Sequence, residues 1–215
     1  MSSIETLRGL YGITDTALMP DDDTLIMKVT AAIEGGMTIL QYRDKSHDDE
    51  KRVRQATRLR ELCDQSGTLF LINDDVDLAL ACGAHGVHLG QSDEALISAR
   101  ERLGGQAIIG ITCEDSMELA RRANDQGADY IAFGRFFPSL TKPDARPAPL
   151  YLLDEAREEF EIPIVAIGGI TRDNAPQLVN SGADMLAVVN DLFSPQDSET
   201  ITLRARDYLS LYHQR

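Results

Sequence analysis

The chain has 215 residues, of which 43% are hydrophobic and 26% are charged. These values are ordinary for a globular protein and exclude a disordered chain or a fibrous repeat. The formal net charge of -14 opposes binding to nucleic acid or to an anionic membrane, because both are polyanions. We expect one domain over residues 1–215, in which a small anionic ligand would need a local cluster of basic groups, backbone amides or a metal ion.

The cysteines and the N-terminus bear on the compartment. Cys63, Cys82 and Cys113 show neither a disulfide nor a zinc-binding spacing, which favours a reducing cytoplasm. Residues 1–10 lack an apolar signal core, and no window approaches the roughly 20 apolar residues that span a bilayer. We therefore expect a cytoplasmic protein with no membrane partner and no export signal.

Eight short β-rich segments recur along the chain, with stretches of helical character between them. Most are continuously apolar, as strands covered on both faces must be, and parallel sheets flanked by helices provide that environment. The expected strands are Leu10–Asp15, Thr38–Arg43, Leu69–Asp74, Gly86–Gly90, Ala107–Thr112, Tyr130–Gly134, Ile164–Gly168 and Met185–Asn190.

The intervening stretches support closure of these strands into a barrel. Asp48–Gln65 and Glu114–Gln126 place apolar side chains along one side, as outer helices do. A weak repeat of small-residue pairs ends every second helical stretch shortly before a strand, where glycine suits the left-handed position. The pairs are Gly35-Gly36, Gly83-Ala84, Gly127-Ala128 and Gly182-Ala183. The predicted fold class is α/β, a single (β/α)8 TIM barrel.

One long connection, from Phe136 to Leu150, is interrupted by several prolines. A linker would separate two cores, but a helical stretch over Tyr151–Phe160 resumes the rhythm directly afterwards. We therefore interpret the connection as an active-site loop that follows the sixth strand.

Basic residues at the strand ends indicate an anion site, because active sites of such barrels lie at the carboxyl ends of the strands. Arg43 and Lys45 lie two apart in an extended segment, so both side chains can project to the same side. Two basic residues alone would be a solvated charge run. Lys142 is expected across the barrel mouth, and three converging cations in an acidic protein favour binding of a polyphosphate.

Two carboxylates suggest a magnesium site next to these cations. Asp74 and Asp93 end the third and fourth expected strands, so they lie on adjacent loops and could share one hard cation. The alternative is that each caps the helix that follows it.

Paired glycines mark a second candidate site. Gly168 and Gly169 close the seventh strand and Asn190 follows the eighth, where barrels often bind phosphate through backbone N–H groups. A tight turn capped by Thr171 or Asp173 is the alternative, and it is compatible with phosphate binding.

Two further residues receive no catalytic role. His88 is expected to be a hydrogen-bonded histidine in the interior or near the site, and Cys113 a buried thiol without an adjacent base.

Six motifs occur in order near the expected strand ends. They are Gln41-Tyr42-Arg43-Asp44-Lys45, Ile72-Asn73-Asp74, Gly86-Val87-His88-Leu89-Gly90-Gln91-Ser92-Asp93, Gly127-Ala128-Asp129-Tyr130, Phe137-Pro138-Ser139-Leu140-Thr141-Lys142 and Ile167-Gly168-Gly169-Ile170-Thr171. Taken together they closely resemble the thiamine-phosphate synthase family, and the likeness covers nearly the whole chain.

The resemblance implies a transferase that joins 4-amino-2-methyl-5-(diphosphooxymethyl)pyrimidine to a thiazole phosphate and releases pyrophosphate. Its partners would be these small phosphorylated substrates. The residues implied to bind the pyrimidine diphosphate are Gln41, Tyr42, Arg43, Asp44, Lys45, Asn73, Thr112 and Lys142, with Arg43, Lys45 and Lys142 as the catalytic cations. Those implied to bind the thiazole phosphate are Ser139, Leu140, Thr141, Gly169, Val189 and Asn190. Asp74 and Asp93 would hold one Mg²⁺ per subunit.

Some positions depart from the residues usual in the family. Thr112 replaces a serine and Ser139 a threonine, so a hydroxyl is kept at both positions. Asn190 replaces a serine but can still donate a hydrogen bond. Asp75 stands where arginine is frequent, which alters the charge near the metal.

Three other functions are compatible with the same fold. A thiazole tautomerase of the same superfamily would need neither the carboxylate pair nor the three cations, so the synthase is preferred. A regulatory protein could keep the barrel and bind thiazole phosphate without turnover, and a phosphate-binding enzyme of sugar or amino-acid metabolism could share the fold. The oligomeric state, the kinetic order of the substrates and any channelling partner stay open.

Overall fold

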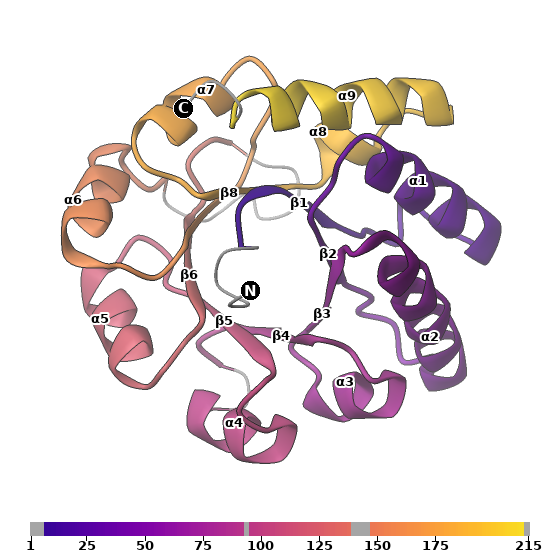
Figure 1. Ribbon diagram of the computed structural model, residues 1–215, viewed down its shortest axis with the longest axis horizontal. Coiled ribbons are helices and arrows are strands. Elements are labelled where there is room, and N and C mark those ends of the chain that lie inside the picture. The colour runs from indigo at the N-terminus through magenta and orange to yellow at the C-terminus, as the bar shows by residue number, and fades with distance from the viewer. Residues whose placement is uncertain (1–6, 93–94, 139–146, 213–215) are drawn as a thin grey trace.

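The computed structural model describes residues 7–92, 95–138 and 147–212. Eight parallel strands close into a barrel in chain order, with β8 paired to β1. Figure 1 shows the strands around the centre and the helices in a ring outside them. The predicted (β/α)8 TIM barrel is confirmed.

The strands alternate with helices along the whole described chain. The strands are β1 Gly9–Ile13, β2 Ile39–Tyr42, β3 Leu69–Asn73, β4 Gly86–Leu89, β5 Ile108–Thr112, β6 Tyr130–Gly134, β7 Ile164–Ile167 and β8 Met185–Val188. The helices are α1 Asp22–Glu34, α2 Asp49–Ser66, α3 Val76–Cys82, α4 Leu96–Leu103, α5 Met117–Asp125, α6 Tyr151–Glu159, α7 Ala175–Asn180, α8 Asn190–Phe193 and α9 Ser198–Ser210. Each expected strand is present, although β8 ends at Val188 and Asn190 opens the short helix α8.

Burial on both faces explains why the strands are continuously apolar. Along β2, Ile39 belongs to the cluster that fills the barrel, whereas Leu40 belongs to the cluster between the strands and the helices. Neither face meets water, so the alternation typical of a half-buried strand is absent.

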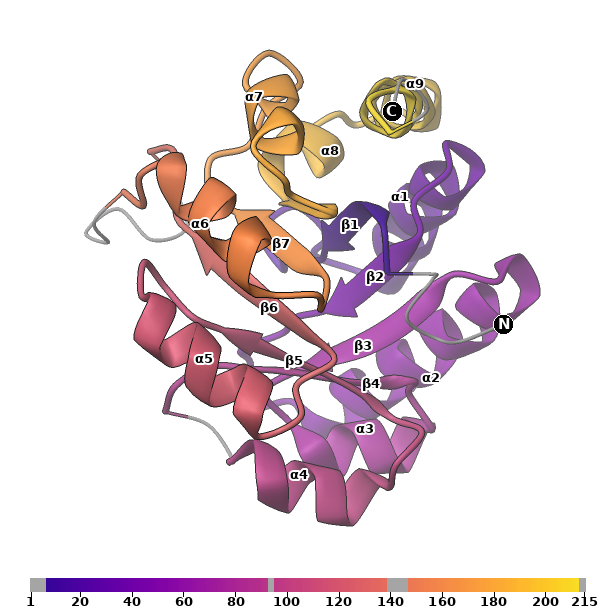
Figure 2. The ribbon, with the colours of Figure 1, turned by 60° about the vertical axis from the view of Figure 1, so that its left-hand side comes forward.

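The last helix, α9, packs against α1 and lies beside α8, as Figure 2 shows. Lys28 of α1 is fully buried and donates from Nζ to the carbonyl of Phe193 at 2.8 Å, which joins α1 to the end of α8. Burial lowers the pKa of this ammonium below its ordinary value.

For three of the four small-residue pairs, the repeat has a structural reason that involves the residue after the pair. His85, Asp129 and Asp184 each accept a backbone N–H from a neighbouring strand, at the residues Phe70, Ile109 and Ile164 and at 2.9, 2.7 and 2.9 Å. The glycine two residues before each of them has a positive φ and turns the chain out of the helix. The repeat therefore satisfies strand N–H groups at the end of the barrel where the strands begin.

Asp184→Ala should lower the free energy of unfolding by about 1–3 kcal/mol, because the Ile164 N–H and the Arg157 guanidinium both lose an acceptor. The predicted transferase activity should stay near normal, since Asp184 precedes β8 and lies at the end of the barrel where the strands begin. Urea unfolding measures the change, with Glu158→Ala on the exposed face of α6 as control. Equal stability of the two variants would contradict the proposed role of Asp184.

Candidate active site

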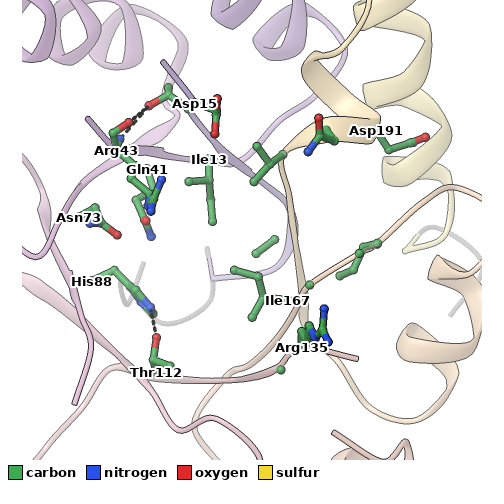
Figure 3. Close-up of a pocket in the computed structure, with 18 of the residues that line it drawn as sticks. Ile13, Asp15, Gln41, Arg43, Asn73, His88, Thr112, Arg135, Ile167 and Asp191 are labelled. Atoms are coloured by element: carbon green, nitrogen blue, oxygen red, sulfur yellow. Dashed lines mark hydrogen bonds between the residues drawn. The ribbon is translucent and has the colours of Figure 1, made fainter. Parts of the chain in front are cut away.

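A cavity of about 870 Å³ opens where the strands end. It receives residues from each of the eight strands or the loops that follow them, and Figure 3 shows their side chains converging on it. The lining includes Ile13, Thr14, Asp15, Gln41, Arg43, Asn73, His88, Thr112, Glu114, Asp115, Gly134, Arg135, Pro138, Ile167, Gly168, Gly169, Ile170, Thr171, Ala187, Val189, Asn190, Asp191 and Ser194. Seven of the sequence-predicted site residues are therefore brought together: Gln41, Arg43, Asn73, Thr112, Gly169, Val189 and Asn190.

Hydrogen bonds hold two of these residues at the wall of the cavity. Gln41 is buried, and its Nε2 donates to the Tyr11 hydroxyl at 2.6 Å. Thr112 Oγ1 lies 2.8 Å from His88 Nε2, a bond drawn in Figure 3. The expectation that His88 is a hydrogen-bonded residue near the site is confirmed.

Cys113, which follows Thr112, is buried, and burial raises the pKa of its thiol to about 12. It is therefore protonated at neutral pH, in agreement with the expectation that it is not a nucleophile.

Arg43 is placed by its main chain. Its N–H donates to Thr14 Oγ1 at 2.8 Å and its carbonyl accepts from the same hydroxyl at 3.3 Å, which ties the end of β2 to the end of β1. The side chain lines the cavity (Figure 3).

A smaller hollow of about 330 Å³ adjoins the cavity and holds the other predicted cation. Lys45 and Asp74 form an ion pair there, and Asn73 Nδ2 donates to Asp74 Oδ2 at 2.6 Å. Asn73 lines both spaces, so it marks their common boundary. Arg43 and Lys45 thus lie in adjoining spaces and not in one.

Asp74 does not cap the following helix, so that alternative is wrong. The cap of α3 is Asp75, whose Oδ1 accepts from the Leu78 N–H at 2.8 Å and whose Oδ2 pairs with Arg52 at 2.5 Å. Asp74 adopts a φ of 63°, a conformation that few residues other than glycine adopt, and its carboxylate is turned toward the hollow.

Two residues of the first motif support the loop after β2. Asp44 lines the hollow and pairs with Lys51 of α2 at 2.8 Å. Burial by itself raises the pKa of Asp44, but hydrogen bonds from Lys51 and the Ser46 amide bring it below its ordinary value. Tyr42 lines neither space: it is buried toward α2 and donates to Gln55 at 2.8 Å. This position argues against the expected direct contact of Tyr42 with substrate.

The paired glycines form a tight turn at the opposite side of the cavity. Gly168 and Gly169 have φ of 101° and 64°, and a Cβ on Gly169 would lie 2.4 Å from the carbonyl oxygen of Pro138. The turn is closed by Asn174, whose Oδ1 accepts from the Thr171 N–H at 2.9 Å. The tight turn of the alternative is therefore present, but the N-cap of α7 is Asn174, and the Thr171 hydroxyl accepts from its N–H at 3.4 Å.

Three further residues belong to the site or its floor and were not selected from the sequence. Arg135 follows the last residue of β6, and a basic residue at a strand exit was an available signal. Tyr11 and Tyr130 lie inside the barrel, and only the register of the strands reveals that they meet.

Five predicted residues lie outside the described part of the chain, so the hypotheses about them stay predictions. They are Asp93, Ser139, Leu140, Thr141 and Lys142. The alternative role of Asp93 as a helix cap stays a prediction for the same reason, and the described N-cap of α4 is Ala95.

A closed (β/α)8 barrel with a cavity at its carboxyl rim, lined by apolar groups together with arginine, carboxylate, amide and hydroxyl side chains, is the architecture of an enzyme for small substrates. Residues 10–192 match the family model described as thiamine monophosphate synthase. The chain belongs to this family, whose reaction forms thiamine phosphate, and it is a transferase.

Individual relatives agree with this assignment. The chain is 50% identical over 203 residues to the thiamine-phosphate synthase of Alcanivorax borkumensis, covering 94% of this chain and 93% of the relative. A solved structure of a thiamine phosphate pyrophosphorylase from Pyrococcus furiosus matches with a TM-score of 0.86 and 33% identity, covering 99% of this chain and 98% of the other. A second, from Bacteroides thetaiotaomicron, has a TM-score of 0.71 at 18% identity over 96% and 98% of the two chains, and supports the fold alone. Among the described residues, no helix has the length and apolar character needed to cross a membrane.

Gly169→Ala should raise the KM for thiazole phosphate while the KM for the pyrimidine diphosphate changes little. The added methyl meets the carbonyls of Pro138 and Phe137, at 2.4 and 2.7 Å, and Ala resists the positive φ. Steady-state kinetics with each substrate varied in turn measures both constants. The control is Gly105→Ala, where a Cβ meets nothing within 4 Å. Equal loss of both affinities would contradict separate subsites.

Proposed function

We propose that the cavity binds the thiazole phosphate and the pyrimidine ring, while the adjoining hollow binds the diphosphate of the second substrate. The observation that carries this proposal is the shared boundary at Asn73, with Arg43 on one side and Lys45 on the other. A substrate with an uncharged ring and a charged diphosphate needs two spaces of this kind side by side. The roles of individual residues in binding the two substrates rest on the same arrangement and on the family resemblance.

The diphosphate is held by Arg43, Lys45, Asn73 and Lys142, and the ring by Gln41 and Thr112. Arginine offers a planar fork for phosphate oxygens, and lysine supplies a compact charge. Asp44 acts indirectly, because its ion pair with Lys51 orients the loop that carries Lys45.

The thiazole phosphate is held on the other side of the cavity by Ser139, Leu140, Thr141, Gly169, Val189 and Asn190. Gly169, Val189 and Asn190 line the cavity on the loops after β7 and β8. Backbone N–H groups beside glycine can approach a phosphate closely because no side chain intervenes.

The residues around the hollow fit one magnesium ion. Four carboxylates, those of Asp44, Asp74, Asp75 and Asp77, line it, and hard oxygen ligands are the ones that Mg²⁺ prefers. No group of three or more His, Cys, Asp or Glu among the described residues is arranged as a complete metal site. Asp74 would therefore act with Asp93 and with diphosphate oxygens. When bound, Mg²⁺ would draw negative charge from the diphosphate.

The reaction breaks the bond between the exocyclic methylene of the pyrimidine and the diphosphate oxygen, which leaves with the electron pair. The aminopyrimidine ring delocalises the positive charge on that carbon, and the thiazole nitrogen donates its lone pair to form the new C–N bond. Arg43, Lys45 and Lys142 stabilise the charge that develops on pyrophosphate. The cavity wall aligns the two rings and excludes water, which would otherwise trap the cation.

The competing functions are less well supported. A tautomerase would not need Lys45 and Asp74 in the hollow. The relative with 50% sequence identity to this chain is a thiamine-phosphate synthase. A cytoplasmic location and small-molecule partners without nucleic acid remain predictions from the net charge and the cysteines.

Asp74→Ala should lower turnover on the order of 100-fold at saturating substrates, because the leaving group loses a metal ligand. Activity of the wild type should disappear on exhaustive chelation and return with Mg²⁺. The matched control is Asp197→Ala, which removes the cap of α9 and should reduce stability by about 1 kcal/mol with near-normal turnover. Kinetics across a magnesium titration, with thermal unfolding alongside, separates the two effects. Full activity without a divalent cation would rule out the metal site.

Lys142→Ala should reduce kcat far more than it raises the KM for thiazole phosphate, because the ammonium acts on charge that develops on the leaving group. The comparison is kcat and both KM values of this variant against those of Lys142→Arg, which keeps the charge. Near-normal kcat for the alanine variant would make Lys142 a solvated loop residue.

A further inference from the structure

A continuous chain of hydrogen bonds crosses the interior of the barrel beneath the cavity. Gln41 Nε2 donates to the Tyr11 hydroxyl at 2.6 Å, and this hydroxyl lies 2.9 Å from that of Tyr130. The Tyr130 hydroxyl lies 2.9 Å from His88 Nδ1, and His88 Nε2 lies 2.8 Å from Thr112 Oγ1. The chain thus runs from β2 through β1, β6 and β4 to β5, and both of its ends line the cavity.

The chain is built into the packing of the barrel. Tyr11 and Tyr130 are fully or almost fully buried, at 1% and 0% exposure, and their rings meet edge to face with centroids 6.1 Å apart. Tyr130 also stacks on His88 at 5.6 Å with an angle of 14° between the rings. The space for the Tyr130 ring exists because residue 110 is glycine: a Cβ there would lie 1.9 Å from Tyr130 Cζ.

The chemistry of the donors sets one direction along the chain. The Gln41 amide nitrogen can only donate, so the Tyr11 hydroxyl accepts there and gives its own proton to Tyr130. Tyr130 then donates to His88 Nδ1, which leaves a neutral His88 with its proton on Nε2, directed at Thr112. The opposite direction would leave the Tyr11 proton without an acceptor in the chain.

Burial supports this sequence of donors. It raises the pKa of Tyr11 and of Tyr130 well above the ordinary value for a phenol, so each keeps its single hydroxyl proton at any physiological pH.

We propose that Tyr11, Tyr130 and His88 are positioning residues, which hold the Gln41 amide as an acceptor and the Thr112 hydroxyl as a donor toward the ligand in the cavity. The Gln41 side-chain nitrogen donates to Tyr11 inside the barrel, so the side-chain oxygen of Gln41 faces the cavity as an acceptor. The Thr112 hydroxyl accepts from His88, so its own proton is available to a ligand in the cavity. The ligand edge that fits carries a donor opposite Gln41 and an acceptor opposite Thr112. The inference rests on the assignment of these two residues to the pyrimidine diphosphate in the proposed function.

A purely structural role would be served by branched apolar side chains, which commonly fill the interior layers of such barrels. A buried polar chain is stabilising only if every member is paired, and here the chain begins and ends at a residue that lines the cavity. The chain therefore couples the donor pattern of the site to Tyr11 and Tyr130, which do not line the cavity.

Tyr130→Phe tests this inference, because it keeps the ring and removes the central hydroxyl. In steady-state kinetics of the full-length enzyme with Mg²⁺, the KM for the pyrimidine diphosphate should rise roughly fivefold or more, the effect of one lost hydrogen bond. The KM for thiazole phosphate should stay within about twofold. In a Thr112→Ala background the same substitution should have a clearly smaller further effect on the KM for the pyrimidine diphosphate, because one of the two groups that the chain positions is gone.

The controls separate positioning from stability and from the subsite assignment. Thr68→Val removes a buried hydroxyl just before β3, at the opposite end of the barrel, and should change stability without changing either KM. If Tyr130→Phe does not fold, Tyr11→Phe, which leaves the Tyr130–His88 bond intact, gives the same readout through Gln41. An unchanged KM for the pyrimidine diphosphate, equal changes in both constants, or full additivity with Thr112→Ala would overturn the inference. If Gln41→Ala and Thr112→Ala themselves leave that KM unchanged in an active enzyme, the subsite assignment fails instead.

Discussion

Closure of eight parallel strands is the constraint on which the site depends. Because all strands run in one direction and β8 pairs with β1, their carboxyl ends form a single rim. Residues separated by more than a hundred positions, such as Gln41 and Asn190, thereby line one cavity. At the other end of the barrel the requirement is different. There Asp129 and Asp184 use their carboxylates to satisfy strand N–H groups, and the chemistry is purely structural.

In a chain with a net charge of -14, the basic side chains of the hollow are held by ion pairs with carboxylates. The ion pair between Lys45 and Asp74 joins the loops after β2 and β3 at the boundary of the cavity, while Asp44 pairs with Lys51 of α2. An incoming diphosphate can exchange with Asp74 as the partner of Lys45. The basic side chain is thus already placed where an anion is expected to bind, and the acidic one where a cation is expected.

The fold and the position of the site could be predicted because they depend on periodic and local signals. Continuous apolar runs marked each strand, and polar residues at their ends marked the rim. Side-chain direction was harder to predict. Tyr42 lies next to Gln41, but a strand alternates, so Gln41 enters the barrel while Tyr42 packs against α2. The contacts among Tyr11, Tyr130 and His88 depend on the stagger of strands that are distant in sequence, and no local pattern contains that information. Asp74 and Asp75 are adjacent candidates for the cap of α3, and only the backbone conformation decides between them.

The central claim is that one cavity aligns a pyrimidine diphosphate with a thiazole phosphate and couples their union to release of pyrophosphate. It is tested most directly by incubating the purified protein with both substrates and Mg²⁺ and quantifying thiamine phosphate and pyrophosphate together over time. Equal amounts of the two products are expected throughout, with little hydrolysis of the pyrimidine diphosphate, because the two bound substrates keep water from the reacting carbon. Pyrophosphate released without matching thiamine phosphate, or no pyrophosphate at all, would contradict the central claim.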